Sequence, residues 1–133
     1  MDNNGLNTIL STFSVRETID RLSEKAASLE LTVFARVDHA AGAEKAGIKM
    51  RPTELLIFGN PKGGTPLMQD RQTAGIDLPL KALAWEDADG KVWLTYNDAY
   101  WIAERHGLAR STTEAVKAIA SGMEAITKYA AVG

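Results

Sequence analysis

LLIFGNPKGGTPLM, residues 55–68, is the most informative segment of this chain. Its first four residues are large and apolar without polar alternation, a pattern typical of a strand that is covered on both faces. Residues 59–66 are rich in Gly, Asn and Pro, which favours a turn whose backbone N–H groups are exposed. Because loops held by a rigid strand tend to carry function, we expect a ligand site at this turn.

Length and composition limit the classes of protein to consider. The 133 residues fit a single domain over 1–133, with a formal net charge of −2 and no Cys. The lack of Cys excludes disulfides, thiol catalysis and Cys-based metal sites. The charge balance and the lack of a Lys/Arg run argue against nucleic-acid binding. Residues 1–5 do not resemble a signal peptide and no apolar run could span a bilayer, so we expect a soluble cytoplasmic domain without a membrane partner.

Local sequence patterns predict the elements around this segment. Ser14 and Glu17 have the spacing of a capping box ahead of a helical apolar stripe at 15–28. Asp87-Ala88-Asp89-Gly90 predicts the turn of a β-hairpin. The full set of predicted elements is strands at 6–13, 31–38, 54–59, 80–86 and 91–96, helices at 15–28, 40–46, 66–72 (capped by Thr65), 98–106 (capped by Asn97) and 111–130 (capped by Ser111), and an irregular loop at 73–79.

The order of these elements favours an α+β fold. The tight turn at 87–90 makes the last strand pair antiparallel, which argues against a fully parallel, doubly wound sheet. We therefore predict a mixed or antiparallel sheet of about five strands, with helices packed mainly on one face. Leu31, Val33, Ala35 and Val37 are expected to share one face of their strand. One of the tryptophans at 85, 93 and 101 is expected to serve a dimer contact, since exposed aromatic side chains favour interfaces.

Several segments, in the same order and spacing, resemble a known family. They are FARVDH and AAGA at 34–43, LIFGNP at 56–61 with GTPLM at 64–68, and GIDLPLK at 75–81 followed by Trp85-Glu86 and Tyr96-Asn97. As a set they resemble the domain of unknown function 302 family over about residues 30–106. The resemblance implies a small, dimeric α+β domain from a mostly bacterial and archaeal family. It implies no catalytic residue, because the family's biochemical role is largely undescribed.

The glycine-rich turn is the first candidate site. Gly63, Gly64 and Thr65 beside Lys62 could form a backbone cradle for a phosphate or carboxylate at the start of a helix. The Lys precedes the glycines and the P-loop spacing is missing, so nucleotide hydrolysis is not expected. The alternative is a tight turn that needs glycine to bend.

Two histidines supply the remaining candidates. His39 follows Asp38 at a strand end, and an imidazole oriented by a carboxylate suits a general base, although adjacent strand residues point to opposite faces. The alternative is that Asp38 caps the next helix. His106, in the last turn of a helix, is expected to meet the C-terminal carbonyls. The two histidines are far apart and lack an HxxxH or HxxE pattern, which argues against a metal site. No cofactor is expected.

These observations define one hypothesis and its alternatives. We predict a homodimeric domain that binds a small anionic molecule through Lys62 and the following amides, with His39 as hydrogen-bond donor or proton acceptor. The alternatives are an enzyme that pairs His39 with Asp38 or Asp77, and a purely structural or protein-binding homodimer; no catalytic residue is assigned. The predicted ligand-binding residues are Asp38, His39, Asn60, Lys62, Gly63, Gly64 and Thr65.

Overall fold

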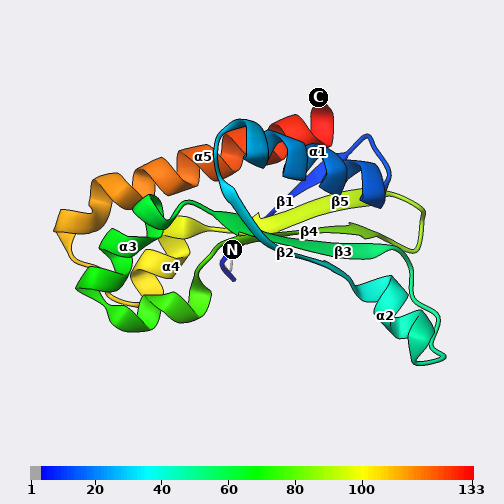
Figure 1. The fold of residues 1–133 in the computed structure, drawn as a ribbon, viewed down its shortest axis with the longest axis horizontal. Helices are drawn as coiled ribbons and strands as arrows, with labels where there is room; N and C mark the ends of the chain where they lie inside the picture. The colour runs from blue at the N-terminus through cyan, green and yellow to red at the C-terminus, as the bar shows by residue number, and fades with distance from the viewer. Residues whose placement is uncertain (1–3) are drawn as a thin grey trace.

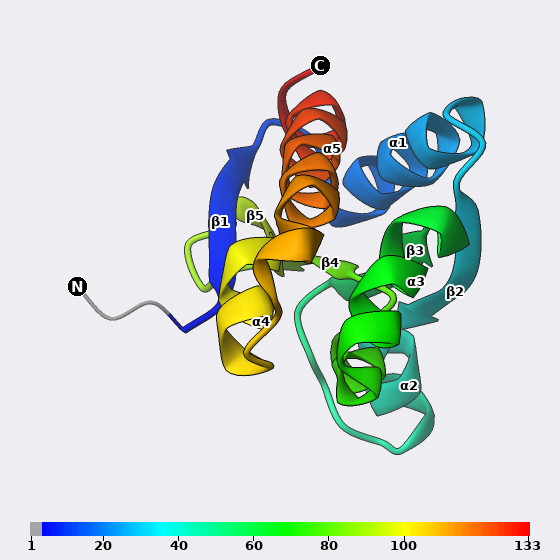
Figure 2. The same cartoon turned by 90° about the vertical axis from the view of Figure 1, so that its left-hand side faces the viewer.

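The computed structural model describes residues 4–133 and contains one five-stranded sheet with its long helices on one face (Figures 1 and 2). Part of the prediction about the N-terminus concerns residues 1–3, which lie outside the described residues. The strand order is β1-β5-β4-β3-β2, and every neighbouring pair is antiparallel, so the predicted α+β class is confirmed. The elements are β1 (Leu6–Ser11), α1 (Val15–Ser28), β2 (Thr32–Asp38), α2 (His39–Lys45), β3 (Thr53–Gly59), α3 (Pro61–Asp70), η1 (Gln72–Asp77), β4 (Lys81–Glu86), β5 (Val92–Asn97), α4 (Ala99–Arg105), η2 (Arg110–Thr112) and α5 (Thr113–Val132).

Helix α1 and the β4–β5 hairpin form where the sequence predicts them. Ser14 Oγ accepts a hydrogen bond from the Glu17 N–H at 3.1 Å and caps α1. In the hairpin turn, Gly90 has a φ of +80°, a conformation that favours glycine. The indole N–H of Trp93 donates to Asp87 Oδ2 at 2.8 Å, and this hydrogen bond lowers the pKa of Asp87 below its ordinary value.

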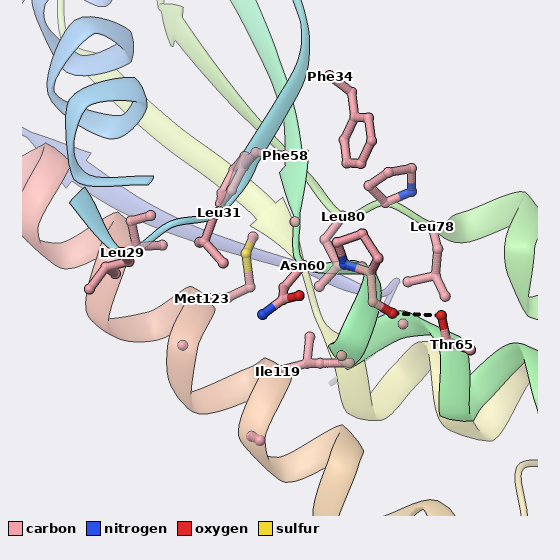
Figure 3. Close-up of a pocket in the computed structure, with 18 of the residues that line it drawn as sticks. Leu29, Leu31, Phe34, Phe58, Asn60, Thr65, Leu78, Leu80, Ile119 and Met123 are labelled. Atoms are coloured by element: carbon pink, nitrogen blue, oxygen red, sulfur yellow. Dashed lines mark hydrogen bonds between the residues drawn. The ribbon is translucent and has the colours of Figure 1, made fainter. Parts of the chain in front are cut away.

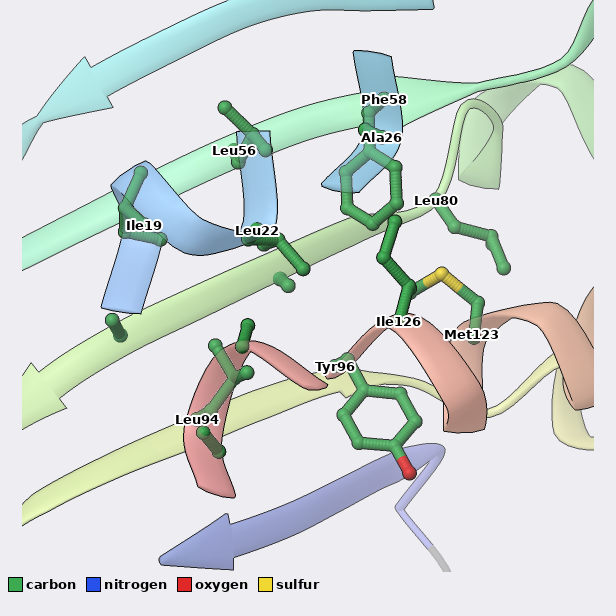
Figure 4. Packing of buried hydrophobic residues seen from close by; sticks show 14 of the residues in the cluster. Ile19, Leu22, Ala26, Leu56, Phe58, Leu80, Leu94, Tyr96, Met123 and Ile126 are labelled. Atoms are coloured by element: carbon green, nitrogen blue, oxygen red, sulfur yellow. The ribbon is translucent and has the colours of Figure 1, made fainter. Parts of the chain in front are cut away.

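The hydrophobic core lies between the sheet and the two long helices, α1 and α5 (Figure 4). On β3, the side chains of Leu56 and Phe58 point toward the helices and are 0% and 1% exposed. On the neighbouring strand β4 the buried positions are Ala82 and Ala84, whose small side chains allow the helices to approach the sheet closely. Because a fully buried large apolar side chain contributes about 1.5–3 kcal/mol, this single layer supplies most of the hydrophobic stabilisation.

Within residues 4–133, no helix packs along the opposite face of the sheet. Leu55 and Ile57 alternate with the buried residues of β3 and keep intermediate exposure. The prediction that residues 55–58 form a strand covered on both faces is therefore wrong for this chain. The prediction of helices mainly on one face is confirmed (Figure 1). The continuous apolar run arises because the second face of the sheet is also apolar.

Strand β2 departs from regular alternation. Its register against β3 shifts between Val33 and Ala35, so that Val33 is paired with Phe58 and Ala35 with Ile57. An extra residue in one strand of a pair reverses the side-chain alternation beyond it. The prediction that Val33 shares a face with Ala35 and Val37 is consequently wrong.

The same shift places Arg36 on the helix-covered side of the sheet, where it pairs with two carboxylates. Its Nη1 donates to Asp20 Oδ1 at 2.7 Å, and its Nε donates to Glu54 Oε1 at 2.9 Å. Desolvation by itself would lower the pKa of Arg36, but the hydrogen bonds to Asp20 and Glu54 outweigh it and raise that pKa above its ordinary value. Glu54 is buried, so this contact supplies the charged partner that its carboxylate needs.

The start of α4 differs from the prediction. Asp98, not Asn97, is the N-cap, and its Oδ1 accepts the N–H of Tyr100 at 2.9 Å. Asn97 still belongs to β5, where its Oδ1 accepts the N–H of Lys81 at 2.8 Å. The Asn97 side chain, predicted to cap the helix, therefore bonds to the backbone of the neighbouring strand β4 instead.

Two other predicted boundaries also change. Helix α5 begins at Thr113 after the short 3-10 turn η2, and it has no side-chain cap hydrogen bond, so the predicted Ser111 cap is wrong. The predicted irregular loop at 73–79 is largely the 3-10 turn η1.

Replacing Arg36 with Leu is expected to lower the free energy of unfolding by about 1–3 kcal/mol, because Glu54 would stay buried without its charged donor. Urea denaturation measures the change. Adding Glu54→Gln to Arg36→Leu should restore part of the loss, since the buried charge is then gone. Arg110→Leu, at an exposed position, is the control and should change the stability by no more than about 0.5 kcal/mol. Equal losses in Arg36→Leu and Arg110→Leu would contradict this role of Arg36.

Candidate functional site

The glycine-rich turn of the sequence is the first turn of helix α3. Asn60 is its N-cap, and Pro61 occupies the first helical position, where a missing N–H costs little. Asn60 Oδ1 accepts the N–H of Lys62 at 2.9 Å, and the Asn60 carbonyl accepts the N–H groups of Gly63 and Gly64 at 2.8 and 3.2 Å. The sequence predicts that these amides bind an anion, but the N–H groups of Lys62, Gly63 and Gly64 are already hydrogen-bonded to Asn60 at the start of the helix.

The predicted start of this helix at Pro66 is wrong. Both Pro61 and Pro66 could occupy a first helical position, but Asn60 at the end of β3 provides the cap for the earlier one. Pro66 then lies inside α3, where it removes a backbone donor and weakens the helix. Thr65 is a helical residue instead of the N-cap, and its hydroxyl donates to the Pro61 carbonyl at 2.6 Å.

A cavity of about 460 Å³ lies between the start of α3, the end of the sheet and α5 (Figure 3). Its size falls in the range of about 300–1,000 Å³ that is typical of small-molecule sites. Apolar side chains form most of its wall. Those that Figure 3 labels around the opening between β3 and α5 include Leu31, Phe58, Leu80, Ile119 and Met123.

Residues without bulky side chains keep this cavity open. Gly63 and Gly64 of α3 and Ala118 and Gly122 of α5 all line it. Neither Gly63 nor Gly64 has a positive φ, so the alternative prediction that they are needed to bend a tight turn is wrong. A Cβ at Gly122 would meet no atom within 4 Å. A Cβ at Gly63 would lie 3.6 Å from Ile119 Cγ1, so Gly63 packs against α5 and the open space lies in front of Gly122.

Asn60 offers the clearest polar group in the wall of the cavity. Its Oδ1 is engaged by the Lys62 N–H, which fixes the orientation of the side-chain amide. Figure 3 shows the amide nitrogen pointing toward α5, into the space between Ile119 and Met123. A bound molecule would therefore meet an N–H donor at this point of an otherwise apolar wall.

Asp38 and His39 lie at the opposite end of the sheet from α3 (Figure 1). Asp38 Oδ1 accepts the N–H of Ala41 at 2.9 Å and caps α2, which confirms the structural alternative for this residue. Asp38 lines a separate open hollow beside α2, whereas exposed His39 lines neither hollow nor cavity. Of the predicted ligand-binding residues, the cavity collects Asn60, Gly63, Gly64 and Thr65 and leaves out Asp38, His39 and Lys62.

Sequence reasoning missed a polar cluster between η1 and the end of α4. His106 Nε2 lies 2.6 Å from Asp77 Oδ2, and Arg105 Nη1 donates to both oxygens of Asp77 at 3.0 and 3.1 Å. The His106 side chain is 8% exposed, and its Nδ1 lies 3.5 Å from the Thr73 hydroxyl. Asp77 thus pairs with His106 and not with His39, the partner considered for an enzyme. No local signal links Asp77 to His106, since 29 positions separate them.

Fold and cavity together define a small α+β domain with a one-sided antiparallel sheet and an apolar cavity at the sheet's end. The chain belongs to the family described as domain of unknown function DUF302, whose family model matches residues 7–126. The resemblance seen in the sequence is thereby confirmed. The crystal structure of an uncharacterized conserved DUF302 protein from Bacillus stearothermophilus superposes with a TM-score of 0.83. That match covers 96% of this chain and 99% of the other at 16% identity, and so it supports the fold alone.

Similar sequences carry a functional name. The chain is 58% identical over 127 residues to the fluoride-specific ion channel FluC 1 of Brucella suis biovar 1 (strain 1330) and to the protein of the same name from Brucella abortus biovar 1 (strain 9-941). These matches cover 96% of this chain but 50% and 47% of the relatives, so the chain spans about half their length. Over residues 4–133, no helix combines the length and the apolar character needed to cross a membrane.

Replacing Asp77 with Ala is expected to lower the free energy of unfolding by about 1–3 kcal/mol, because the buried His106 ring would lose its hydrogen-bond partner. Thermal or urea denaturation measures the loss. His39→Ala is the matched control and should change the stability by no more than about 0.5 kcal/mol, since His39 is exposed. A larger loss in His39→Ala than in Asp77→Ala would contradict this assignment.

Proposed function

We propose that this domain binds a small, largely apolar molecule with an oxygen acceptor at one end, in the cavity between α3 and α5. The observation that carries the proposal is the composition of helix α3, whose residues Gly63 and Gly64 line the cavity. Gly63, Gly64 and Pro66 all lie within a ten-residue helix. Each interior glycine costs about 0.8–1 kcal/mol relative to Ala, and an interior proline costs more. Such local costs are expected at functional sites, where sequences depart from the residues that best stabilise the element.

The acceptor group would lie at Asn60. The amide nitrogen of Asn60 is the donor that points toward α5, and an oxygen of the ligand would complete its hydrogen bonding. Lys62 does not line the cavity, but it is exposed and directly follows Pro61, which does, so we propose that its flexible side chain brings the ammonium group to the opening when a ligand binds. A carboxylate therefore suits this end better than a neutral carbonyl. The proposal keeps the small anionic ligand of the sequence hypothesis and adds an apolar body to it.

Decanoate is a suitable probe, since it combines an alkyl chain with a carboxylate. At about ten times its dissociation constant, a bound ligand adds about 1.4 kcal/mol of stability, which raises Tm by roughly 4–6 °C in a domain of this size. Gly122→Phe is expected to abolish the shift, because the ring would occupy open space in the cavity. Ser121→Phe adds the same ring at an exposed neighbouring position that does not line the cavity, and it should keep the shift.

Two results of this thermal-shift experiment would contradict the proposal. One is the same decanoate shift in Gly122→Phe as in Ser121→Phe, which would place binding outside the cavity. The other is no shift with any carboxylate in a series from butyrate to decanoate, with benzoate included as a planar member. Lys62→Ala should weaken decanoate binding and leave decanol binding unchanged, since only the charged end would meet Lys62.

A part in fluoride handling is a second candidate, supported by the name of the relatives at 58% identity. We infer that this domain would be an accessory part of such a channel. The described lining of the cavity contains no Lys or Arg, and a small, strongly hydrated anion would lose its water there without charged compensation. An apolar ligand in this domain could instead act on an attached channel.

Fluoride efflux from liposomes tests this second candidate in the Brucella suis relative. Deleting the half that matches this chain should leave fluoride conduction in place, and adding decanoate should change the conduction of the full-length protein only. Complete loss of conduction in the correctly inserted, truncated protein would contradict an accessory role.

A further inference from the structure

We propose that a second copy of this chain packs on the uncovered face of the sheet. The open face is defined here as the strand residues that point away from α1 and α5. The strand registers place them side by side, because directly paired residues point to the same face. Its apolar members are Leu6, Leu10, Val37, Leu55, Ile57, Leu83, Trp85 and Trp93.

The open face carries little charge. Among its described strand positions, Lys81 at one end of β4 is the charged residue, because charged side chains such as Arg36 and Glu54 point to the helix-covered side. In an antiparallel sheet with one solvated face, that face normally carries charged and polar side chains. A large uncharged apolar surface of this kind is typical of a protein interface.

The two indole N–H groups and the hydroxyls of Thr8 and Thr95 on the open face already have partners within the chain. The Trp85 indole N–H donates to Thr95 Oγ1 at 2.9 Å, and that hydroxyl also lies 2.9 Å from Thr8 Oγ1. The Trp93 indole N–H donates to Asp87, and the two indole rings stack with centroids 6.4 Å apart. An apolar partner could therefore cover these residues without leaving a buried donor unsatisfied, which is the main cost of burying tryptophan.

A second unpartnered element lies at the edge of the same face. We call residues 39–52, which contain α2 and its return to β3, the α2 arm. Helix α2 has seven residues and none is buried, while Ile48 and Met50 in the following segment are 63% and 51% exposed. Isolated helices shorter than about 12–15 residues are marginal in water, so α2 gains from a partner surface. Figure 1 shows α2 projecting beyond the end of β2 and the start of β3, on the side away from α1 and α5.

The area of the open face explains why an interface would need both parts. Five strands about 4.8 Å apart, each about six residues long at about 3.3 Å per residue, give a face of roughly 480 Å². A standard stable interface buries about 800 Å² per partner. The open face alone falls short of this value, and the α2 arm supplies the remainder if it reaches over the edge of the partner's sheet.

A two-fold arrangement satisfies both surfaces at once. Closed dimers are built from one self-complementary patch, so each copy must offer what the other needs. In this arrangement the two open faces, which carry little charge, pack against each other. Each α2 arm packs against the apolar edge of the sheet in the other copy. An acidic or basic partner would leave its charges without complement on this face. The homodimer predicted from the sequence is thereby given a definite surface.

Sedimentation equilibrium between about 1 and 200 µM tests the proposal. The wild type should reach twice the chain mass of 14.4 kDa. Leu83→Arg on the open face and Ile48→Arg on the α2 arm should each weaken association at least about tenfold, because each places an unpaired charge in the interface. Val132→Arg is the control: Val132 is 54% exposed at the end of α5, and this variant should associate as the wild type does.

Each possible outcome bears on the proposal. A wild type that stays monomeric at the highest concentration would overturn it, as would Ile48→Arg and Leu83→Arg chains that associate as tightly as Val132→Arg. If Leu83→Arg does not fold by circular dichroism, Ile48→Arg decides, since that exposed position contributes nothing to the core. In the dimer, acrylamide should quench Trp85 and Trp93 less than in the Ile48→Arg monomer; unchanged quenching would count against the open face.

Discussion

The packing of α1 and α5 on one face of the antiparallel sheet is the contact on which the rest of this structure depends. Leu56 and Phe58 of β3 supply the large apolar side chains of the sheet, and Ile126 of α5 lies against them (Figure 4). Ala82 and Ala84 let the helices come close over the next strand. Because both long helices are used on this face, no helix of residues 4–133 remains to cover the other. The one-sided core therefore creates the exposed apolar face.

The same packing also creates the cavity, because α5 is longer than the sheet it covers. Its 20 residues extend about 30 Å, whereas the seven residues of β3 extend about 23 Å. The N-terminal half of α5 reaches beyond the sheet, where α3 and α4 pack against it (Figures 1 and 2). Gly122 in α5 leaves open space beside the cavity, whereas a Cβ at Gly63 or Gly64 in α3 would already contact a neighbouring side chain. A molecule with an apolar body would occupy that space, with its polar end at Asn60.

Much of the fold could be predicted from the sequence because it depends on neighbouring residues. The Ser14 cap and the turn at 87–90 are local signals, and the structure contains both. The start of α3 could not be decided locally, since Pro61 and Pro66 are equally suited to a first helical position. The sequence does point to the turn that lines the cavity, but it assigns the chemistry to the amides, which the helix start uses. The cavity itself depends on where α5 lies, and residues 55–68 contain no local signal for the position of a helix that is distant in the sequence.

The central claim, that the cavity takes a small amphipathic molecule, is tested most directly by NMR of methyl-labelled methionines. Met68 and Met123 line the cavity, whereas Met50 is 51% exposed on the α2 arm and serves as an internal control. On titration with decanoate, we predict saturable shifts of the Met68 and Met123 methyl signals, with contacts between both methyl groups and the alkyl chain, and no shift at Met50. Unchanged signals from Met68 and Met123 at saturating decanoate, or equal shifts at Met50, Met68 and Met123, would contradict the account.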